Sequence, residues 1–195
     1  MSLTIYRATD TEWVERCRRH DRQAQRHVYE FFASRMYALC CRYIASRMEA
    51  EDVMVTAFTK VFERIDQFKG EGSFEGWIRR IMVNECLTYL RRNKSLYLDV
   101  DVEKAEREPD YQALESHLQA EDLMNLIAAL PTGYRMVFNL YAIEGYSHLE
   151  IAAQLGITEN TSKSQLSRAR ALLQKRLIEL NVETKKSQHH GPQHG

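Results

Sequence analysis

Proline and glycine are scarce in this chain of 195 residues, which contains three prolines and eight glycines. Because both residues interrupt regular structure, their scarcity favours long helices or strands over a loop-rich fold. No apolar run approaches the roughly 20 residues that a membrane-spanning helix needs. The first residues, MSLTIYRATD, also lack the apolar core of a secretory signal. We therefore expect a cytoplasmic protein with no membrane insertion.

Motifs for metal or catalytic chemistry are missing as well. The four cysteines, at positions 17, 40, 41 and 86, lack the C-x-x-C spacing of zinc and redox sites, which favours reduced, packed thiols. No nucleotide-binding glycine loop or nucleophile motif occurs. Glu49, Glu51 and Asp52 could in principle hold a metal ion, but no His or Asp stands at ligand spacing from them. We expect no catalytic residue, no metal and no cofactor, so an enzyme is disfavoured.

The formal net charge of zero hides an uneven distribution of charge. Residues 1–94 contain 17 basic against 13 acidic side chains, and residues 123–195 contain 8 against 5. Residues 95–122 contain 2 against 9. This pattern predicts two basic parts joined by an acidic strap.

The apolar residues recur at spacings of three and four, which predicts an all-α protein. Residues 1–94 predict one compact helical domain, with a short helix after residue 11 and longer helices over about 21–46, 50–68 and 74–92. Ser73 is placed to cap the last helix. The short helix carries Trp13, Val14 and Cys17. The apolar faces predicted for the longer helices are Val28, Phe31, Phe32, Met36, Leu39, Cys40, Tyr43, Ile44, Val53, Ala57, Val61, Ile65, Phe68, Phe74, Trp77, Ile78, Ile81, Leu87 and Leu90.

Helical spacing fails over residues 95–120, where Pro109 stands among the six acidic residues of positions 99–110. We expect a flexible acidic linker, in which a helix could begin near Tyr111. The linker could be a solubilising tether, or it could lie along a basic channel of a partner that normally holds nucleic acid. The sequence leaves both interpretations open.

Residues 121–181 predict a second small domain that ends in a helix-turn-helix. Helices over about 121–130 and 132–143 come first, and residues 182–195 read as a disordered polar tail. Ser147 and Glu150 form a capping box for the next helix, and Gly156 supplies a left-handed turn. A basic helix follows, with Leu166, Ala169, Leu173, Leu177 and Leu180 as its apolar seam. A DNA-binding second helix explains the basic face, although an ordinary antiparallel helix pair would share the pattern.

A second polar stripe lies on the helix predicted over 74–92. Arg80, Asn84, Thr88 and Arg91 are spaced by four, four and three residues, so they share one face. Arginine suits phosphates and guanine edges, and asparagine can pair with a base edge. A solvated helix face is the alternative interpretation. The absence of acidic residues on the stripe favours nucleic acid.

These residues carry a resemblance to a known family. The segment from about Glu51 to Arg92, with EDV…AFTKVF and FKGEGSFEGWIRRIMVNECLTYLRR, resembles region two of bacterial sigma factors. The segment ALPTGYRMVFNLYAIEGYSHLEIAAQLGITENTSKSQLSRAR resembles their region four. Both regions in this order, joined only by a linker, resemble the extracytoplasmic-function (ECF) group of the sigma-70 family over about residues 10–180.

The resemblance implies a transcription factor that is inactive alone and binds core RNA polymerase, through the clamp helices and the flap of the beta subunits. It also implies promoter DNA and an anti-sigma factor as partners. The residues implied to read and open the minus-ten element are Lys69, Ser73, Trp77, Arg80, Asn84, Thr88 and Arg91. Those implied for the minus-thirty-five element are Thr161, Lys163, Ser164, Ser167, Arg168 and Arg170. Those implied to bind core polymerase are Glu51, Asp52, Val55 and Phe58.

The chain departs from the family pattern at three positions. Val55 stands where glutamine is common, which changes the clamp contact. Ser162 replaces a common apolar residue and is expected to loosen the seam of the recognition helix. Gln165 replaces a common arginine and is expected to make a different contact with a phosphate or base.

Two rival functions do not need the resemblance. An ordinary helix-turn-helix repressor or activator, with an N-terminal sensing or dimerising domain, would bind its operator without polymerase. A helical adaptor that binds only protein would leave both basic stripes unexplained.

Overall fold

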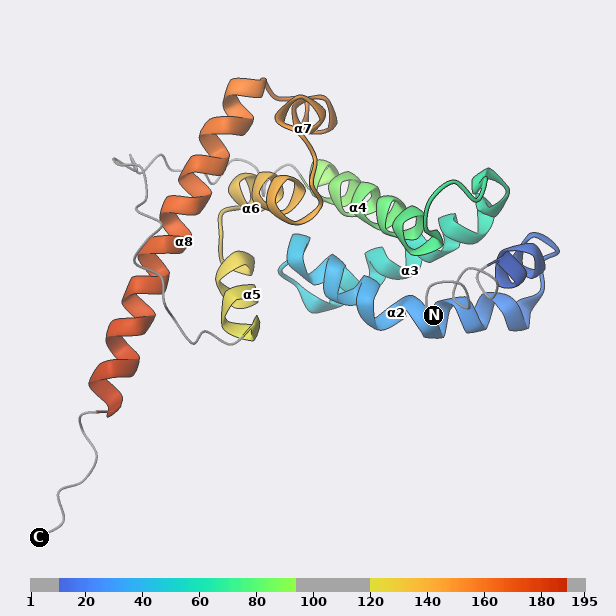
Figure 1. The fold of residues 1–195 in the computed structure, drawn as a ribbon, viewed down its shortest axis with the longest axis horizontal. Coiled ribbons are helices and arrows are strands. Elements are labelled where there is room, and N and C mark those ends of the chain that lie inside the picture. The colour runs from blue at the N-terminus through green and yellow to red at the C-terminus, as the bar shows by residue number, and fades with distance from the viewer. Residues whose placement is uncertain (1–10, 94–119, 189–195) are drawn as a thin grey trace, which may run out of the picture. The chain divides into compact units, whose positions relative to one another are not determined.

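The computed structural model describes residues 11–93 and 120–188, and all of its regular elements in these ranges are helices (Figure 1). The chain divides into two compact units, unit 1 over Met1–Lys94 and unit 2 over Ser95–Gly195. The predicted acidic linker lies outside the described residues, except for Ala120. Within the described ranges, no helix is both long enough and apolar enough to cross a membrane.

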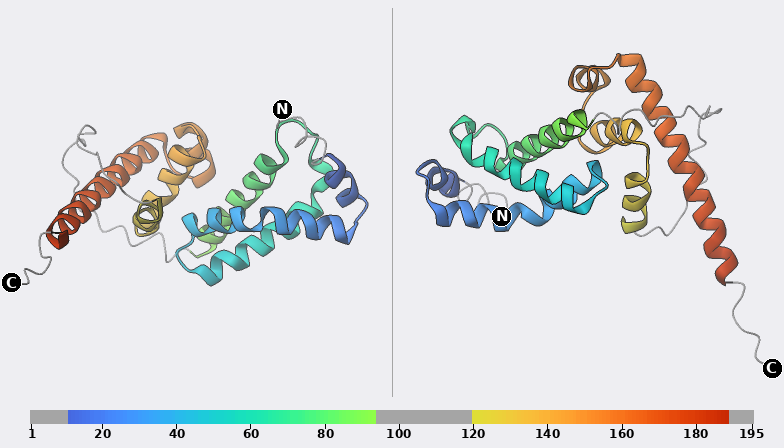
Figure 2. Two further views of the ribbon diagram at one scale, coloured as in Figure 1. Left: turned by 60° about the horizontal axis from the view of Figure 1, so that its bottom comes forward. Right: turned by 180° about the vertical axis from the view of Figure 1, so that it is seen from behind.

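Unit 1 is built from three long helices that pack against one another. A helix over residues 11–18 precedes α2 (Arg22–Tyr43), α3 (Arg47–Glu63), the 3-10 turn η1 (Ile65–Gln67) and α4 (Phe74–Arg92). Each of α2, α3 and α4 contacts the other two, and Figure 2 shows this arrangement from two further sides. The predicted helices of this region are confirmed, and α3 begins three residues earlier than expected because Ser46 caps it.

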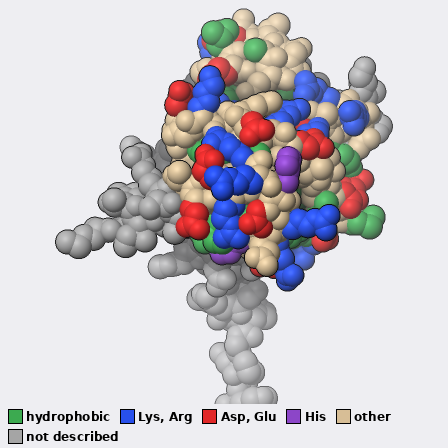
Figure 3. Space-filling model, turned by 90° about the vertical axis from the view of Figure 1, so that its right-hand side faces the viewer, with side chains coloured by type: hydrophobic (Ala, Val, Ile, Leu, Met, Phe, Trp, Pro, Cys, Tyr) green, Lys and Arg blue, Asp and Glu red, His purple; other side chains and the backbone are tan. Residues whose placement is uncertain are grey.

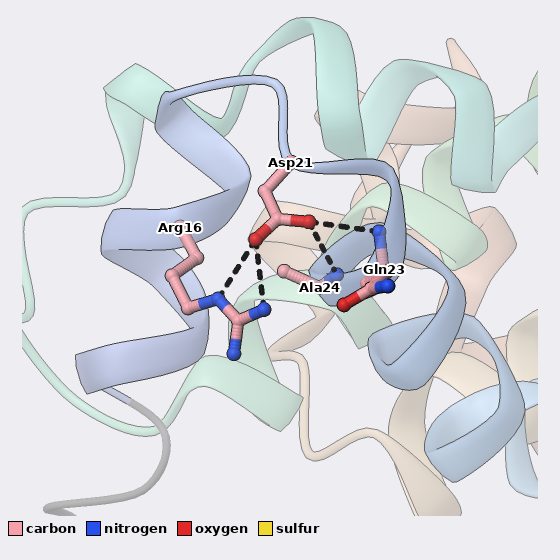
Figure 4. A network of polar contacts seen from close by, with 4 residues as sticks. All are labelled: Arg16, Asp21, Gln23 and Ala24. Carbon is pink, nitrogen blue, oxygen red and sulfur yellow. Dashed lines mark hydrogen bonds and ion pairs between the residues drawn. The ribbon is translucent and has the colours of Figure 1, made fainter.

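A side-chain cap starts each long helix of unit 1. Asp21 accepts hydrogen bonds from the backbone N–H groups of Gln23 and Ala24, and Arg16 binds the second oxygen of the same carboxylate at 2.8 Å (Figure 4). The hydrogen bond from Arg16 and those from the backbone hold the pKa of Asp21 below its usual value. Asp21 therefore joins the start of α2 to the preceding helix. Ser73 caps α4 as predicted, accepting from the N–H of Gly76 at 3.0 Å.

The predicted apolar seams form the core of unit 1. Val28, Phe32, Met36 and Tyr43 of α2 are at most 3% exposed, as are Ile78 and Leu90 of α4. Phe31 is an exception: it is 41% exposed, with its ring edge against Phe32 and the guanidinium of Arg35 over its face. It lies one residue beyond the buried stripe and is therefore not a core residue.

Unit 2 contains α5 (Ala120–Ala128), α6 (Thr132–Phe138), the π-helical turn η4 (Asn139–Ile143), α7 (His148–Leu155) and α8 (Glu159–Gln188). The predicted helix over 132–143 is thus an α-helix that continues as a π turn. The last helix extends seven residues past the expected boundary at 181. No glycine or proline interrupts the sequence between Gly156 and Gly191, so no helix breaker ends it sooner.

The core of unit 2 is smaller and contains polar side chains. Ile127, Leu130, Tyr134, Ala169 and Leu173 form one buried cluster between α5, α6 and α8. Arginine, asparagine and serine side chains are also buried in this unit, at positions 135, 139 and 162.

Two arginines bind the end of α5 in unit 2. Arg135 is 6% exposed and donates to the carbonyl oxygens of Ala128 and Leu130, while Arg176 donates to Ala129. Helix C-termini leave carbonyls unpaired, and a cation there also favours the helix dipole. Arg135 therefore joins the end of α5 to α6, and Arg176 joins it to α8.

Candidate nucleic-acid interface

Local hydrogen bonds fix the start of α7 and the start of α8, with the turn between the two helices at Gly156. The backbone N–H of Ser147 donates to Oε2 of Glu150 at 2.8 Å, and the N–H of Glu150 donates to Oγ of Ser147 at 3.3 Å. The predicted capping box is therefore confirmed. Gly156 has φ of 67°, the left-handed conformation expected of it, and Thr158 accepts from the N–H of Thr161 at 3.0 Å. The sequence thus specifies where the two helices of the helix-turn-helix begin and where the turn between them lies.

The first turns of α8 present a polar, mostly basic surface. Lys163, Ser164 and Ser167 are exposed, while Thr161, Arg168 and Arg170 are half-buried. Lys163 forms an ion pair with Glu159 at 2.7 Å, one turn earlier on the same helix. Solvent screens this exposed pair and makes it weak, so a phosphate can replace Glu159 as the partner of Lys163.

Ser162 does not loosen the seam of α8, contrary to our expectation. Its side chain is fully buried, and its Oγ lies 2.9 Å from Nδ1 of His148 at the start of α7. A buried hydroxyl with a hydrogen-bond partner costs far less than an unpaired one, which explains how serine is tolerated there. Sequence reasoning missed His148 because its partner stands 14 residues away.

Gln165 lies between α8 and α6. Its side-chain amide is 3.4 Å from the position that a Cβ on Gly133 would occupy, so it packs against α6. The residue is half-buried, so part of it remains at the surface. The contact with a phosphate or base that we expect of it stays a prediction.

The glycine loop of unit 1 is held at both ends. Gly70 and Gly72 have φ of 77° and 85°, conformations that favour glycine. Before the loop, Arg18 donates to the carbonyl oxygen of Phe68 at 2.5 Å; after it, Ser73 caps α4. Arg18 is a residue that sequence reasoning missed, because it reaches the loop from 50 residues away. Lys69 and Glu71 are exposed in this loop, and hydrogen bonds hold the residues on either side of it.

Trp77 packs against residues that flank this loop and is half-buried. Its ring stacks on Phe74 with centroids 5.9 Å apart and lies 5.6 Å from the ring of Phe68. Both of these partners are buried, at 2% and 8% exposure. One part of Trp77 therefore packs on the two aromatic residues that flank the loop, and the remainder reaches the surface.

The polar stripe of α4 is solvent-facing, as its spacing predicts. Arg80, Asn84 and Arg91 are exposed, and Thr88 is half-buried. Oγ1 of Thr88 donates to the backbone oxygen of Asn84 at 2.8 Å and accepts from Arg91 at 3.3 Å. Neither Arg80 nor Lys69 forms an ion pair with another described residue. Among the described residues, no carboxylate therefore competes with an anionic ligand for either cationic group.

The residues implied to bind polymerase do not all lie on the surface of α3. Glu51, Asp52 and Val55 are exposed, and Val55 is an exposed apolar side chain at 48%. Phe58 is 2% exposed, with its ring 4.8 Å from that of Tyr29. The expectation that Phe58 contacts a partner directly is wrong for the folded unit, because its position belongs to the core side of α3.

The acidic residues near the start of α3 do not form a metal site. Burial and a hydrogen bond to Glu49 raise the pKa of Tyr89 to about 12, so Glu49 is engaged with α4. No group of three or more His, Cys, Asp or Glu side chains that could hold a metal ion occurs among the described residues.

On one face of the molecule the charges are mixed rather than gathered into one field. Figure 3 shows a face on which Lys and Arg side chains alternate with Asp and Glu. Arg26 is paired with Glu30, and Arg35 of α2 with Glu75 of α4. Because nonspecific affinity for DNA depends on phosphate neutralisation, such a surface favours weak binding to free DNA.

Comparison with known proteins identifies both units. Residues 28–96 match the model of Sigma-70 region 2, and residues 120–173 match that of Sigma-70, region 4. The chain is 32% identical over 176 residues to the ECF RNA polymerase sigma-E factor of Escherichia coli (strain K12), covering 83% of this chain and 91% of the relative. It is 29% identical over 179 residues to the ECF RNA polymerase sigma factor SigW of Bacillus subtilis (strain 168), covering 86% and 96%.

A solved structure is also similar. It is the sigma factor RpoE from Bartonella quintana in complex with the anti-sigma factor NepR, with a TM-score of 0.49 and 23% identity over 79% of this chain and 96% of that one.

Proposed function

Because this chain belongs to the ECF group of the sigma-70 family and directs promoter-specific initiation of transcription, we propose that its two units read separate promoter elements. Unit 1 reads and opens the minus-ten element, and unit 2 reads the minus-thirty-five element. The boundaries that we propose for these parts are residues 1–94 and 121–181, with residues 95–120 as the linker.

The minus-ten surface is the glycine loop together with the exposed stripe of α4. The observation that carries this assignment is that Asn84 and Arg80 are exposed beside one another while the loop base is held by Arg18 and Ser73. Reading an extruded base costs a few kcal/mol of unstacking, which a pre-formed pocket must offset. The half-buried Trp77 and the fixed loop supply such a rigid surface.

The minus-thirty-five surface is the first part of α8. Lys163 and Arg168 supply charge for phosphates, and Ser164, Ser167 and Thr161 supply groups that hydrogen-bond to bases or phosphates. Arg170 belongs to the same set, although its guanidinium lies 5.7 Å above the ring of Tyr141. That contact limits the orientations from which it can reach DNA.

Core RNA polymerase is the partner that brings the two surfaces together. We place its clamp contact on Glu51, Asp52 and Val55 of α3, which are exposed side by side along the helix, and a flap contact on unit 2. The chain supplies no catalytic group in this mechanism and acts in the cytoplasm, where the polymerase is found. An anti-sigma factor that covers the polymerase-facing surfaces would keep the protein inactive until a signal releases it.

The first experiment is transcription by purified core polymerase, with and without this protein, from a fragment library of its own genome. New transcripts that share a pair of upstream motifs would establish the function and identify the promoter. Tight binding to DNA by the protein alone, without new transcripts, would favour the repressor interpretation instead.

Two substitutions then separate the proposed surfaces. Asn84→Ala is expected to reduce discrimination among minus-ten variants by about tenfold, because a base-edge contact is lost. Lys163→Ala is expected to weaken occupancy of all promoters similarly and to lower the salt dependence by about one counterion. Transcript yields from a panel of promoter variants at two salt concentrations measure both effects.

Matched controls use the same replacements at other exposed positions. Asn125→Ala lies on α5, and Lys175→Ala lies on α8 more than three turns beyond Lys163. Both should retain wild-type preference and yield. If Asn84→Ala transcribes every minus-ten variant with wild-type preference, the assignment of the α4 stripe is wrong.

A further inference from the structure

Two polar side chains meet between the helices of the helix-turn-helix. Ser162 is fully buried on α8, and its Oγ lies 2.9 Å from Nδ1 of His148, the first residue of α7. Ser162 directly precedes the exposed Lys163, on the part of α8 proposed to enter the major groove. The contact therefore joins the start of the recognition helix to the first residue of α7.

A second contact fixes the ring of His148 from its other side. The imidazole stacks on Tyr141 of η4, with centroids 4.5 Å apart and planes 20° from parallel. Tyr141 in turn lies under the guanidinium of Arg170 on α8. The histidine thus joins three elements through one hydrogen bond and one ring stack, and both contacts lead to residues of α8.

We propose that His148, in its neutral form, is a positioning residue for the recognition helix, so that specificity for the minus-thirty-five element declines in acid. The inference rests on the proposed function of α8. His148 makes no contact with DNA in this proposal. Its effect is on how Ser162, Lys163 and Arg170 are arranged.

The charges around the imidazole disfavour its protonation. Partial burial is the largest cause, and Lys163 and Arg170 on α8 add repulsion, while Glu159 on α8 opposes them; together they hold the pKa of His148 below its usual value. On its own helix the nearest acid, Glu150, is engaged in the capping box with Ser147. Tyr141 is the titratable group that faces it from η4. A cation at the first residue of α7 is also unfavourable to the helix dipole.

The direction of the pH effect follows from the lowered pKa. A histidine whose pKa is lower in the folded arrangement favours that arrangement at high pH, and the contribution is lost as the pH falls below the usual value of about 6.5. The contribution of His148 to the ordered helix-turn-helix is therefore fully present in neutral and alkaline solution. In acid the ring must charge against Lys163 and Arg170, or it must leave its site between the helices.

The test uses holoenzyme formed from core polymerase and the full chain. Occupancy is measured on two promoter fragments with the same minus-ten element, one with the minus-thirty-five element and one with it scrambled. The ratio of the two occupancies reports specificity and cancels general changes in DNA affinity with pH. Comparing variants at each pH cancels the response of the polymerase itself.

For the wild-type protein, the ratio is expected to fall about threefold between about pH 7.5 and about pH 5.5. His148→Gln replaces the ring by a neutral group that can still bond to Ser162, so it should keep much of the ratio and lose the pH dependence. Ser162→Ala should lower the ratio at every pH because it removes the partner of Nδ1. His20→Asn, a substitution of an exposed histidine in unit 1, should retain the wild-type profile.

Failure of the inference and failure of the proposed function give different results. A His148→Gln holoenzyme with the wild-type fall in ratio, or a Ser162→Ala holoenzyme with the wild-type ratio throughout, would overturn the role of His148 alone. A wild-type holoenzyme that prefers neither fragment at any pH would overturn the function proposed for α8, and the inference with it.

Discussion

Unit 1 and unit 2 are both helical, but their interiors differ in chemistry. Among the described residues, buried arginine, asparagine and serine side chains occur only in unit 2. Unit 1 instead buries large apolar and aromatic side chains between three long helices, including Phe32, Phe74 and Met36. Unit 2 has shorter helices before α8 and a smaller apolar cluster.

The difference indicates two ways of holding a DNA-reading surface in place. Apolar packing contributes much free energy but is not directional, so it suits a rigid base under a loop. Hydrogen bonds contribute less net free energy, yet they are directional and set how one helix lies on another. We therefore expect truncation of a buried apolar side chain to destabilise unit 1 most. Loss of a buried polar group should destabilise unit 2.

The largest expected effect is that of Phe74→Ala. Phe74 is 2% exposed and its ring contacts those of Phe32, Phe68 and Trp77, so its removal should destabilise unit 1 by about 4 kcal/mol. Urea unfolding followed by tryptophan fluorescence measures this, because both tryptophans of the chain lie in unit 1. Unit 2 should unfold as in the wild-type protein.

The exposed Phe31 provides the matched control for this substitution. Phe31→Ala removes a ring that is 41% exposed, and we expect a cost of about 1 kcal/mol. Equal costs for the two substitutions would show that the aromatic cluster around Phe74 is not the centre of the core.

The second effect is that of Arg135→Met, which tests the polar interior of unit 2. Methionine has a similar length but leaves the carbonyls of Ala128 and Leu130 without this donor, so a loss of about 2 kcal/mol is expected. Amide hydrogen exchange in α5 and α6 measures it, because unit 2 contains no tryptophan. Unchanged protection would mean that an apolar side chain serves equally well at this buried position.

Arg176→Met is the control for this substitution. Arg176 also donates to a carbonyl at the end of α5, that of Ala129, but from an exposed position where water can replace it. Its loss should cost about 0.5 kcal/mol. The contrast between the two arginines would isolate the effect of burial from that of the hydrogen bond itself.

The smallest effects come from the helix caps, one in each unit. Ser147→Ala removes a reciprocal capping box and should destabilise unit 2 by about 1 kcal/mol. Ser73→Ala removes a single hydrogen bond to the N–H of Gly76 and should cost unit 1 about 0.5 kcal/mol. Thermal unfolding of the two variants gives both values. A larger loss for Ser73→Ala would show that the glycine loop depends on this cap for its conformation.

Much of the local structure could be predicted from the sequence. The caps at Ser73 and Ser147, the left-handed Gly156 and the seams of α2 and α4 are all read from residues within one or two turns of each other. The helix-turn-helix of α7 and α8 was predicted for the same reason. The extent of α8 was underestimated, because a polar composition does not end a helix when no breaker is present.

At the candidate sites, local spacing left undecided which side of a helix meets another element. Phe58 stands next to the predicted seam of α3, and only the packing of Tyr29 against it shows that it is buried. Gln165 could face either solvent or α6 by its spacing alone. Each of these positions is decided by a neighbour that is distant in the sequence.

The sequence by itself determined the helices, their caps, the order of the two regions and the polar stripes on α4 and α8, because these follow from local spacing and from short-range hydrogen bonds. Only the tertiary structure decided that Arg18 holds the glycine loop, that Arg135 binds the end of α5 and that Ser162 pairs with His148. The physical reason is that such pairs depend on the rotation and crossing of whole helices. Those are set by the sum of many packing contacts rather than by any local pattern.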